Sequence, residues 1–269
     1  VILKAEHLDF QYTKKRKILQ DINFEIREGE MVSIVGTNGA GKSTLAKVIC
    51  GFVGEDSGRL LYGGDDMKGQ TIKERSKIIR YVMQNPNQMI CKPMIFDEVA
   101  LGLRLNDVPE DVIAERVEKA LKICGLSPFK KWPISALSYG QKKRVTIASM
   151  LVMDPKILIL DEPTAGQDYH HYTEIMEFLK SLNESGVTIL MITHDMHLML
   201  EYTSHAIVIS DGKKIGDASA VEILTNEEIA GAANLKVTSL YELAKLTGIE
   251  DAEGFVQKFI DYERRNMRA

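Results

Sequence analysis

Polar and apolar positions alternate in two early segments of the chain. The alternation covers residues 2–10 and 21–27, and a basic stretch at residues 12–17 separates the two. Because side chains of a strand point to its two faces in turn, the pattern predicts two antiparallel strands that each bury one face.

Later strands are indicated by mainly apolar runs. Such runs are typical of parallel strands that are covered on both faces. They predict strands at residues 31–35, 78–83, 157–160 and 186–193, followed by a hairpin of residues 205–209 and 213–215. A short strand is also expected at residues 59–62, within the turn-rich residues 51–64. The pattern predicts an α/β fold in which an antiparallel sheet precedes a parallel sheet.

Helical spacing dominates two other regions. Residues 85–150 are predicted to form a helical insertion between two strands of the parallel sheet. Its first clear helix starts at Pro109 and ends at Gly125, with an apolar stripe of Ile113, Val117, Ala120, Leu121 and Cys124. Residues 218–269 are also helical in pattern, interrupted at Gly248 and Gly254. We therefore expect a main domain over residues 1–217 and a C-terminal helical extension over residues 218–269.

Composition narrows the possible environments. The 269 residues are 45% hydrophobic and 27% charged, and the net charge of −4 provides no basic field for nucleic acid or an anionic membrane. Cys50, Cys91 and Cys124 are far apart, so we expect small buried residues rather than a disulfide or zinc site. The sequence has neither a signal-peptide pattern nor an apolar run of the roughly 18–20 residues that a membrane span needs. We expect a cytoplasmic protein that reaches a membrane only through a partner. The first residue is Val1 rather than Met, so we expect a chain that is processed or cut from a longer one.

A phosphate-binding pattern provides the strongest chemical signal. The pattern G-x-x-x-x-G-K-[ST] lies between a predicted strand and a predicted helix, which is the context that it requires. Its glycines let successive amides point at an anion, and the helix N-terminus adds partial positive charge. We expect Lys42 to reach the β- and γ-phosphates of a nucleotide and Ser43 to bind Mg²⁺. A plain glycine-rich turn is the disfavoured alternative. This phosphate loop consists of Gly36, Thr37, Asn38, Gly39, Ala40, Gly41, Lys42, Ser43 and Thr44.

Polar residues follow the ends of three predicted strands. Gln84 is placed to reach Mg²⁺ and the attacking water, and Asp161 to support Mg²⁺. Glu162 is placed to orient or deprotonate water, and His194 to bond a γ-phosphate. Taken singly, each has a structural alternative: a solvated glutamine, the solvated tip of a strand, or a structural histidine.

Two further signals are weaker on their own. In the segment Leu-Ser-Tyr-Gly-Gln at residues 137–141, Ser138 and Gly140 precede a helical run at residues 142–153 and make an anion site possible. A plain helix N-cap is the alternative. Tyr12 is placed to stack on a flat base, or is an ordinary residue at the end of a strand.

In their order along the chain, these sites resemble the ATP-binding-cassette (ABC) ATPases. The resemblance covers residues 1 to about 217, and residues 137–141, here named the signature segment, are its most specific part because other phosphate-loop families lack it. It implies a phosphate-loop NTPase fold of the RecA-like type, with ATP and Mg²⁺ as cofactors.

The resemblance also implies a role for each residue. Tyr12 would stack on adenine, while Lys42 and the amides of residues 39–44 would hold the phosphates. Ser43, Gln84 and Asp161 would serve Mg²⁺. Glu162 would polarise the attacking water and His194 would sense the γ-phosphate.

The signature segment implies a dimer. In the family, this segment contacts the nucleotide of the opposite subunit, which assigns that role here to Ser138, Gly140 and Gln141. Two subunits would pair head to tail, closing on ATP and separating after hydrolysis. The partner would be a second copy or a different ABC ATPase.

A closer resemblance is to the ATPases of energy-coupling-factor importers. Residues 84–88 and 97–103 resemble their coupling segment, and residues 222–227 through 241–244 are similar to their C-terminal extension, which makes dimer contacts. This implies a transmembrane coupling subunit docked near Gln84 to Leu103, uptake of a vitamin or metal ion, and a place on the inner face of the cell membrane. No nucleic-acid partner is expected.

Three departures from the family pattern are visible. Tyr139 replaces the usual glycine of the signature segment, and Gln167 and Tyr169 replace a usual leucine and proline. Residues 91–94, ahead of the coupling segment, also differ from the usual family sequence. We expect the latter two departures to mark adaptation to a particular partner, such as one half of an asymmetric pair. Glu162 and His194 are intact, so we expect hydrolysis.

Two other functions are disfavoured by the sequence. A soluble ABC ATPase acting on nucleic acid or ribosomes is disfavoured by the short insertion, the single cassette and the acidic balance. A phosphotransferase would have no reason to keep the signature segment.

Overall fold

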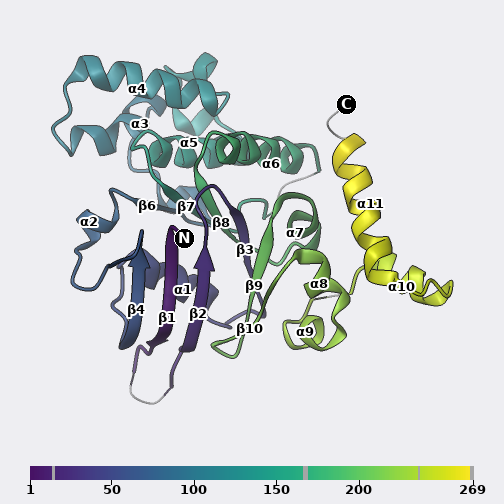
Figure 1. Ribbon diagram of the computed structural model, residues 1–269. Coiled ribbons are helices and arrows are strands. Elements are labelled where there is room, and N and C mark those ends of the chain that lie inside the picture. The colour runs from purple at the N-terminus through teal and green to yellow at the C-terminus, as the bar shows by residue number, and fades with distance from the viewer. Residues whose placement is uncertain (14–15, 166–168, 236, 267–269) are drawn as a thin grey trace. The chain divides into compact units, whose positions relative to one another are not determined.

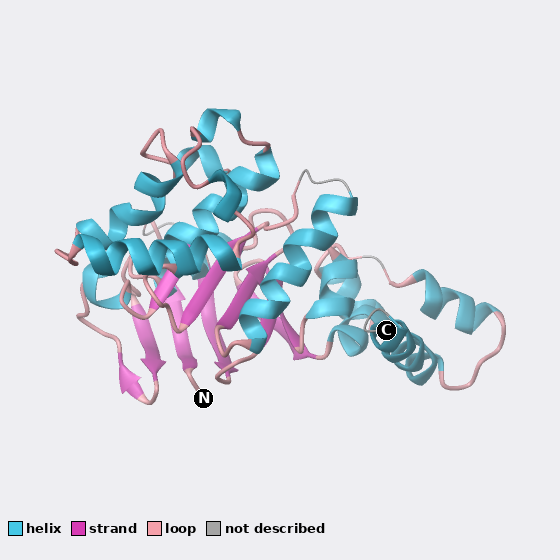
Figure 2. Ribbon diagram, turned by 90° about the horizontal axis from the view of Figure 1, so that it is seen from above, coloured by secondary structure: helices cyan, strands magenta, loops and turns pink. Residues whose placement is uncertain are grey.

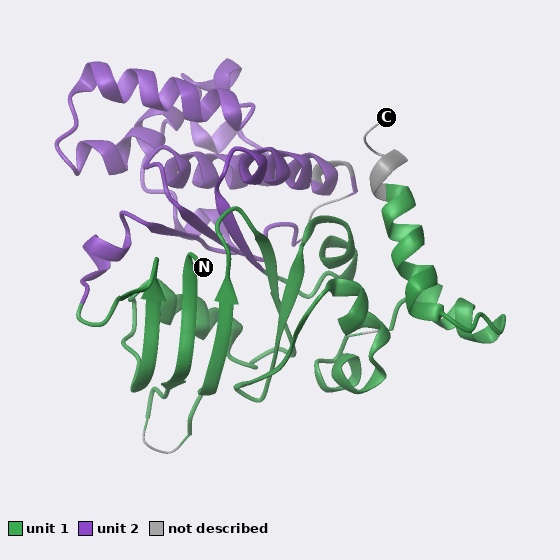
Figure 3. Ribbon diagram, in the orientation of Figure 1, with its two compact units in different colours: residues 1–69, 192–269 green, residues 70–191 purple. Residues whose placement is uncertain are grey.

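The computed structural model describes residues 1–13, 16–165, 169–235 and 237–266, without the side chains of residues 170, 171 and 264–266. The chain forms two compact units (Figure 3). Unit 1 contains residues 1–69 and 192–269, and unit 2 contains residues 70–191.

An antiparallel sheet begins unit 1 (Figure 1). Its strand order is β2-β1-β4-β5, built from β1 (Leu3–Phe10), β2 (Leu19–Ile26), β4 (Ser57–Tyr62) and β5 (Asp65–Asp66). The two strands predicted from alternation are confirmed, although β2 starts at Leu19. In β1, a register shift between Ala5 and Leu8 keeps both residues buried.

A second group of strands in unit 1 carries the phosphate loop. Its members are β3 (Met31–Val35), β9 (His205–Ser210) and β10 (Lys213–Ala218). Strand β3 is buried throughout and pairs with β9 in parallel, while β9 and β10 form the predicted hairpin. Asp211 and Gly212 have φ values of 46° and 77°, which suits a two-residue turn that needs positive φ at both positions.

Helices complete unit 1. They are α1 (Lys42–Ile49), α7 (Met196–Tyr202), α8 (Ala220–Thr225), α9 (Glu227–Ala232), α10 (Ser239–Leu246) and α11 (Ala252–Asn266). Figure 2 shows the helical character of this C-terminal part. Gly254 was expected to interrupt a helix, but it lies inside α11, where its amide bonds the Asp251 carboxylate at 2.8 Å.

The C-terminal helices share a core with the strands of unit 1. Ile223 of α8 and Val256 and Ile260 of α11 pack in one cluster with Val35 and Val208. Burial of these side chains joins the extension to β3 and β9 within unit 1. Division into residues 1–217 and 218–269 remains a prediction.

Unit 2 combines strands with the helical insertion. Its strands are neighbours in the order β8-β7-β6, with bounds β6 (Ile79–Val82), β7 (Ile157–Asp161) and β8 (Thr188–Ile192). Its helices are α2 (Ile72–Arg75), α3 (Ile95–Arg104), α4 (Glu110–Ile123), α5 (Tyr139–Leu151) and α6 (Tyr169–Glu184). Its 3₁₀ turns are η1 (Pro86–Gln88), η2 (Ser127–Phe129) and η3 (Ile134–Ala136).

The predicted insertion is confirmed by α3, α4 and α5, which separate β6 from β7 in sequence. All five residues of the expected apolar stripe of α4 are buried. Helix α5 begins at Tyr139, three residues earlier than predicted, directly after Ser138, which caps it.

The prediction that all three cysteines are buried is wrong for one of them. Cys50 and Cys124 are buried as expected, but Cys91 is exposed in the loop before α3. There the buried Glu98 carboxylate accepts hydrogen bonds from the amides of Cys91 and Lys92, at 2.8 and 2.6 Å, which fix the backbone of the loop. Among the described residues, no helix is both long and apolar enough to cross a membrane.

Candidate functional site

The phosphate loop connects β3 to α1 in unit 1. Gly36, Gly39 and Gly41 have φ values of +143°, +79° and +110°, a region that other residues rarely adopt. A Cβ atom on Gly36 would lie 1.8 Å from the carbonyl oxygen of Ile209, so only glycine fits there. A Cβ atom on Gly39 would meet no atom within 4 Å, so this side of the loop is open.

Lys42 is the cation of this loop. Its side chain is buried, and Nζ donates hydrogen bonds to the carbonyl oxygens of Gly36 and Thr37, at 2.8 and 2.9 Å. Two backbone carbonyls of the phosphate loop therefore hold the Lys42 ammonium group in place. A glycine-rich turn, a buried ammonium and the start of α1 form a cradle that fits the phosphates of a nucleotide.

Unit 1 also brings Tyr12 and His194 toward the loop. The amide of Ile18 bonds the carbonyl of Phe10 at 2.8 Å, and the Ile18 carbonyl lies 3.0 Å from a Cβ built on Gly41. The end of the β1–β2 hairpin thus reaches the loop. Tyr12 lies at this end, 55% exposed, with its ring edge-on to Phe10 at a centroid distance of 4.8 Å.

His194 follows β8 and is exposed. The preceding residue, Thr193, donates its amide to the carbonyl of Ile34 in β3 at 3.2 Å. This bond places the histidine beside the end of the strand that leads into the phosphate loop. Asp195 then caps α7 through the amides of His197 and Leu198, at 3.0 and 3.1 Å. An exposed histidine between a strand end and a capped helix is well placed to meet a phosphate.

Unit 2 brings together the predicted carboxylates and Gln84. Strands β6 and β7 are parallel neighbours, so their carboxyl ends lie at one edge, with Gln84 beyond β6 and Asp161 at the end of β7. Gln84 is exposed. Glu162 has a φ of 47°, a left-handed backbone that is unusual for a residue with a Cβ atom.

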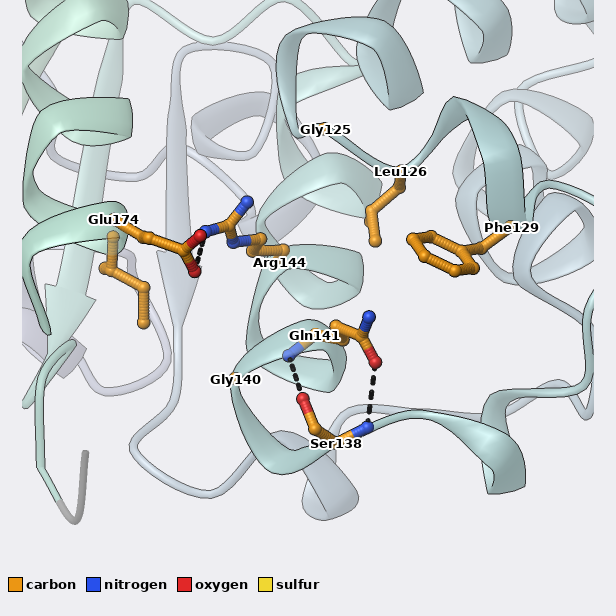
Figure 4. A pocket seen from close by; sticks show the side chains of 9 residues that line it. Gly125, Leu126, Phe129, Ser138, Gly140, Gln141, Arg144 and Glu174 are labelled. Atoms are coloured by element: carbon orange, nitrogen blue, oxygen red, sulfur yellow. Dashed lines mark hydrogen bonds and ion pairs between the residues drawn. The ribbon is translucent and has the colours of Figure 1, made fainter. Parts of the chain in front are cut away.

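The signature segment caps α5. Ser138 Oγ accepts a hydrogen bond from the Gln141 amide at 3.2 Å, while Gln141 Oε1 accepts one from the Ser138 amide at 3.0 Å (Figure 4). The plain N-cap that the sequence left open is therefore present, and it does not exclude an anion at the same helix end.

A pocket of about 470 Å³ adjoins this cap (Figure 4). On one side Arg144 Nη2 donates to Glu174 Oε2 of α6 at 2.8 Å. The pocket is lined by Gly125, Leu126, Phe129, Ser138, Gly140, Gln141, Arg144, Glu174 and Ile175.

Sequence reasoning missed two residues of unit 2. Tyr81 of β6 donates its phenol to Asp161 Oδ2 at 2.6 Å. Lys143 of α5 is 1% exposed, and its Nζ donates to the carbonyls of Gln84, Met83 and Glu162 at 2.7, 3.3 and 3.2 Å. Burial lowers the pKa of Lys143 to about 8, against the opposing influence of the negative charges of Asp161 and Glu162.

Only one of these two residues, Lys143, could have been found from the sequence. Lys143 precedes Ile147 by four residues, so helical spacing places a lysine on an otherwise buried face. Tyr81 left none, because its partner is set by the pairing of β6 with β7. Among the departures, Tyr169 is 70% exposed at the start of α6, and Gln167 lies outside the described residues.

Comparisons with known proteins identify the family. The profile of the ABC transporter family matches residues 19–165, more than half of the chain. A protein of Clostridium perfringens and one of Enterococcus faecalis, both named as ABC transporter ATP-binding proteins, are each 60% identical over 98% of this chain. The match covers 46% of each relative, so the chain spans about half the length of the curated relatives it matches.

Solved structures agree with the fold. CbiO1 from Clostridium perfringens, part of the ABC transporter complex CbiONQ, is 36% identical with a TM-score of 0.80, over 92% of this chain and 99% of CbiO1. An ATP-binding cassette solved in its ADP conformation is 27% identical with a TM-score of 0.78, over 86% of this chain and 97% of that cassette. The phosphate-loop NTPase fold expected from the sequence is therefore confirmed. The family profile covers more than half of the residues, and this chain therefore belongs to the ABC transporter family.

Proposed function

We propose that this module hydrolyses ATP to power a membrane importer of the energy-coupling-factor type. The observation that carries the proposal is the likeness to CbiO1 over nearly the full length of both chains, because CbiO1 is part of the complex CbiONQ. The resemblance of residues 84–103 to the coupling segment of such importers supports the same assignment. The cargo would be a vitamin or a metal ion.

Phosphate binding falls to unit 1 in this proposal. Lys42 and the backbone amides of residues 39–44 hold the phosphates of ATP, and Tyr12 stacks on adenine with its exposed ring. His194 bonds the γ-phosphate. Glycine at position 36 is needed because the loop passes so close to Ile209.

The metal ligands combine three kinds of oxygen donor. Ser43, Gln84 and Asp161 offer a hydroxyl, an amide and a carboxylate oxygen, a set that suits a hard cation such as Mg²⁺. When bound, Mg²⁺ neutralises phosphate charge during the transfer. Tyr81 holds the Asp161 carboxylate in one orientation by its bond of 2.6 Å.

Hydrolysis requires a water molecule aligned with the γ-phosphate. Glu162 orients this water and accepts its proton, so that the oxygen attacks phosphorus and ADP leaves. Ser138, Gly140 and Gln141 contact the γ-phosphate bound to an opposite subunit. ATP thus stabilises a closed pair and hydrolysis releases it. The pair consists of two copies, or of this module and a second ABC ATPase.

The coupling subunit would dock near Gln84 to Leu103. A pocket of about 240 Å³ opens in this part of unit 2, with Ile90 and Pro93 offering apolar surface and Lys92 a positive charge. Glu98 holds the preceding loop by two backbone hydrogen bonds, so that surface has a fixed shape. Such a pocket suits the end of a helix of a membrane protein, which would keep the module on the inner face of the cell membrane.

Purification from membranes and ATPase assays test the proposal. A tagged, full-length protein should recover a hydrophobic coupling subunit and hydrolyse ATP in a Mg²⁺-dependent manner. Replacement of Glu162 by Gln should retain ATP binding, trap the closed pair and reduce turnover by about 10²–10⁴-fold, the usual contribution of a general base. A soluble dimer with no membrane partner would contradict the importer assignment, and full activity of the variant would remove Glu162 from this role.

A further inference from the structure

Two side chains of α5 converge on one backbone oxygen of the Gln84 loop. The phenol of Tyr139 donates to the carbonyl of Gln84 at 3.2 Å, and Lys143 Nζ donates to the same oxygen at 2.7 Å. Tyr139 and Lys143 are four residues apart and so lie on the same face of the helix. A carbonyl oxygen has two lone pairs, so these two donors match its full capacity.

The contact starts inside the signature segment itself. Tyr139 is the first residue of α5 after the cap Ser138, and the residue is 42% exposed while its hydroxyl reaches the loop. Glycine, which the family pattern leads one to expect here, has no side-chain donor. The substitution therefore adds a link that the usual residue cannot make.

Lys143 extends this link to the end of β7. Besides the Gln84 oxygen, its ammonium bonds the carbonyl of Glu162 at 3.2 Å, where the backbone φ is 47°. Charge-assisted bonds of a buried ammonium are stronger than neutral ones, so this cation forms a firm junction. The start of α5, the Gln84 backbone and the Glu162 backbone thereby meet at one point.

We propose that Tyr139 is a positioning residue that ties the signature segment to the Gln84 backbone of the same subunit. When the first turn of α5 moves to meet a phosphate, the phenol and Lys143 carry the Gln84 carbonyl with it, and so set the place of the Gln84 side chain. This proposal rests on the proposed function for the role of Gln84 in hydrolysis. The tether itself depends only on the contacts of Tyr139.

Hydrogen exchange tests the tether without ATP. In the full-length protein, replacement of Tyr139 by Phe removes only the hydroxyl, and the amides of residues 87–90, which form the turn after Gln84, should exchange about 3- to 10-fold faster. Replacement of Tyr62 by Phe in β4 is the matched control and should leave these rates unchanged. Equal rates in the Tyr139 variant and the unaltered protein would overturn the proposal.

ATPase kinetics test the positioning role. The Tyr139→Phe variant should lose about 3- to 10-fold in kcat at saturating Mg²⁺-ATP while KM changes less than 2-fold, because the phosphate loop is untouched. Faster exchange with unchanged kcat would show a tether with no positioning role, which overturns the proposal. An unaltered protein that exchanges as expected but hydrolyses no ATP would contradict the proposed function and not the tether.

Discussion

The phenol oxygen of Tyr81 lies 2.6 Å from Oδ2 of Asp161 and donates a hydrogen bond to it. The bond crosses from β6 to β7, two parallel neighbours in unit 2. A carboxylate held in this way presents a fixed oxygen to a cation, which lowers the cost of ordering the ligand when metal binds. The pair connects a residue without obvious chemistry to the proposed Mg²⁺ site.

Replacement of Tyr81 by Phe should weaken Mg²⁺ binding selectively. Without the phenol, the Asp161 carboxylate loses a contact that orients it, and loss of such an outer contact usually costs about 10-fold or more in metal affinity. The Mg²⁺ concentration for half-maximal ATPase activity should rise by about that factor, while ATP binding in the presence of a chelator stays the same. The Tyr62→Phe variant serves as the control. An unchanged Mg²⁺ requirement would separate Tyr81 from the metal site.

Two glycines of the phosphate loop should tolerate alanine differently. Alanine at Gly36 would place a Cβ atom 1.8 Å from the Ile209 carbonyl, whereas alanine at Gly39 meets no atom within 4 Å and suffers only from its φ of +79°. We expect Gly39→Ala to cost about 1–2 kcal/mol of unfolding free energy, the usual penalty of the left-handed region. Gly36→Ala should cost at least about 2 kcal/mol more, because backbone must move. Chemical denaturation measures both, and equal costs would contradict the close approach at Gly36.

The cap and anion roles of Ser138 can be separated by two substitutions. Ser138→Ala removes the cap of α5 and should cost about 1 kcal/mol of unfolding free energy. Ser138→Asp retains a good cap, so its stability should stay within about 0.5 kcal/mol of the unaltered protein. Its carboxylate, however, would repel the γ-phosphate of an opposite subunit.

The measurement is ATP-dependent dimer formation beside thermal unfolding. Ser138→Asp should lose the ATP-dependent dimer despite its retained stability, whereas Ser138→Ala should lose stability and dimerise only more weakly. A stable Ser138→Asp variant that still pairs on ATP would show that the residue is a cap and nothing more.

The sequence predicted those parts of the site that are set by neighbours in the chain. The phosphate loop is a continuous segment, and the signature segment and the strand-end residues Gln84, Asp161 and Glu162 stand at boundaries that hydrophobic patterning makes visible. The longer strands of unit 1 were predictable for the same reason, but the two-residue β5 was not predicted. Helix α6 was not, since it begins next to residues 166–168, where composition provided no clear start.

Contacts that depend on tertiary packing could not be predicted from the sequence. Tyr81 meets Asp161 only because β6 pairs with β7 in a register that places Tyr81 opposite Ile159. Tyr139 was visible as a departure from a family pattern, but its partner is a backbone oxygen 55 residues earlier, which no side-chain pattern encodes. The exposed Cys91 was misassigned because the sequence does not show that Glu98 holds that loop by its backbone.

The buried ammonium of Lys143 should make folding stability depend on alkaline pH. Burial lowers its pKa from the usual 10.5 to about 8 in the folded protein, so between these values the unfolded chain binds more protons. Unfolding free energy then rises with pH across this window, and the full cost of burying the charge applies below pH 8. Asp161 and Glu162 are the charged groups that face the ammonium and oppose this shift.

Comparison with a Lys143→Met variant isolates this dependence, since other groups that titrate above pH 8 cancel in the difference. Methionine fills a similar volume but carries no proton, so this site makes no pH-dependent contribution to the stability of the variant. Between about pH 8 and pH 10, the unaltered protein should gain on the order of 2 kcal/mol relative to the variant, at 1.36 kcal/mol for each unit of pKa difference. Denaturant unfolding at a series of pH values measures the difference. A constant difference would mean that the three carbonyls of Met83, Gln84 and Glu162 hold the ammonium charged in the folded state as firmly as water does in the unfolded one.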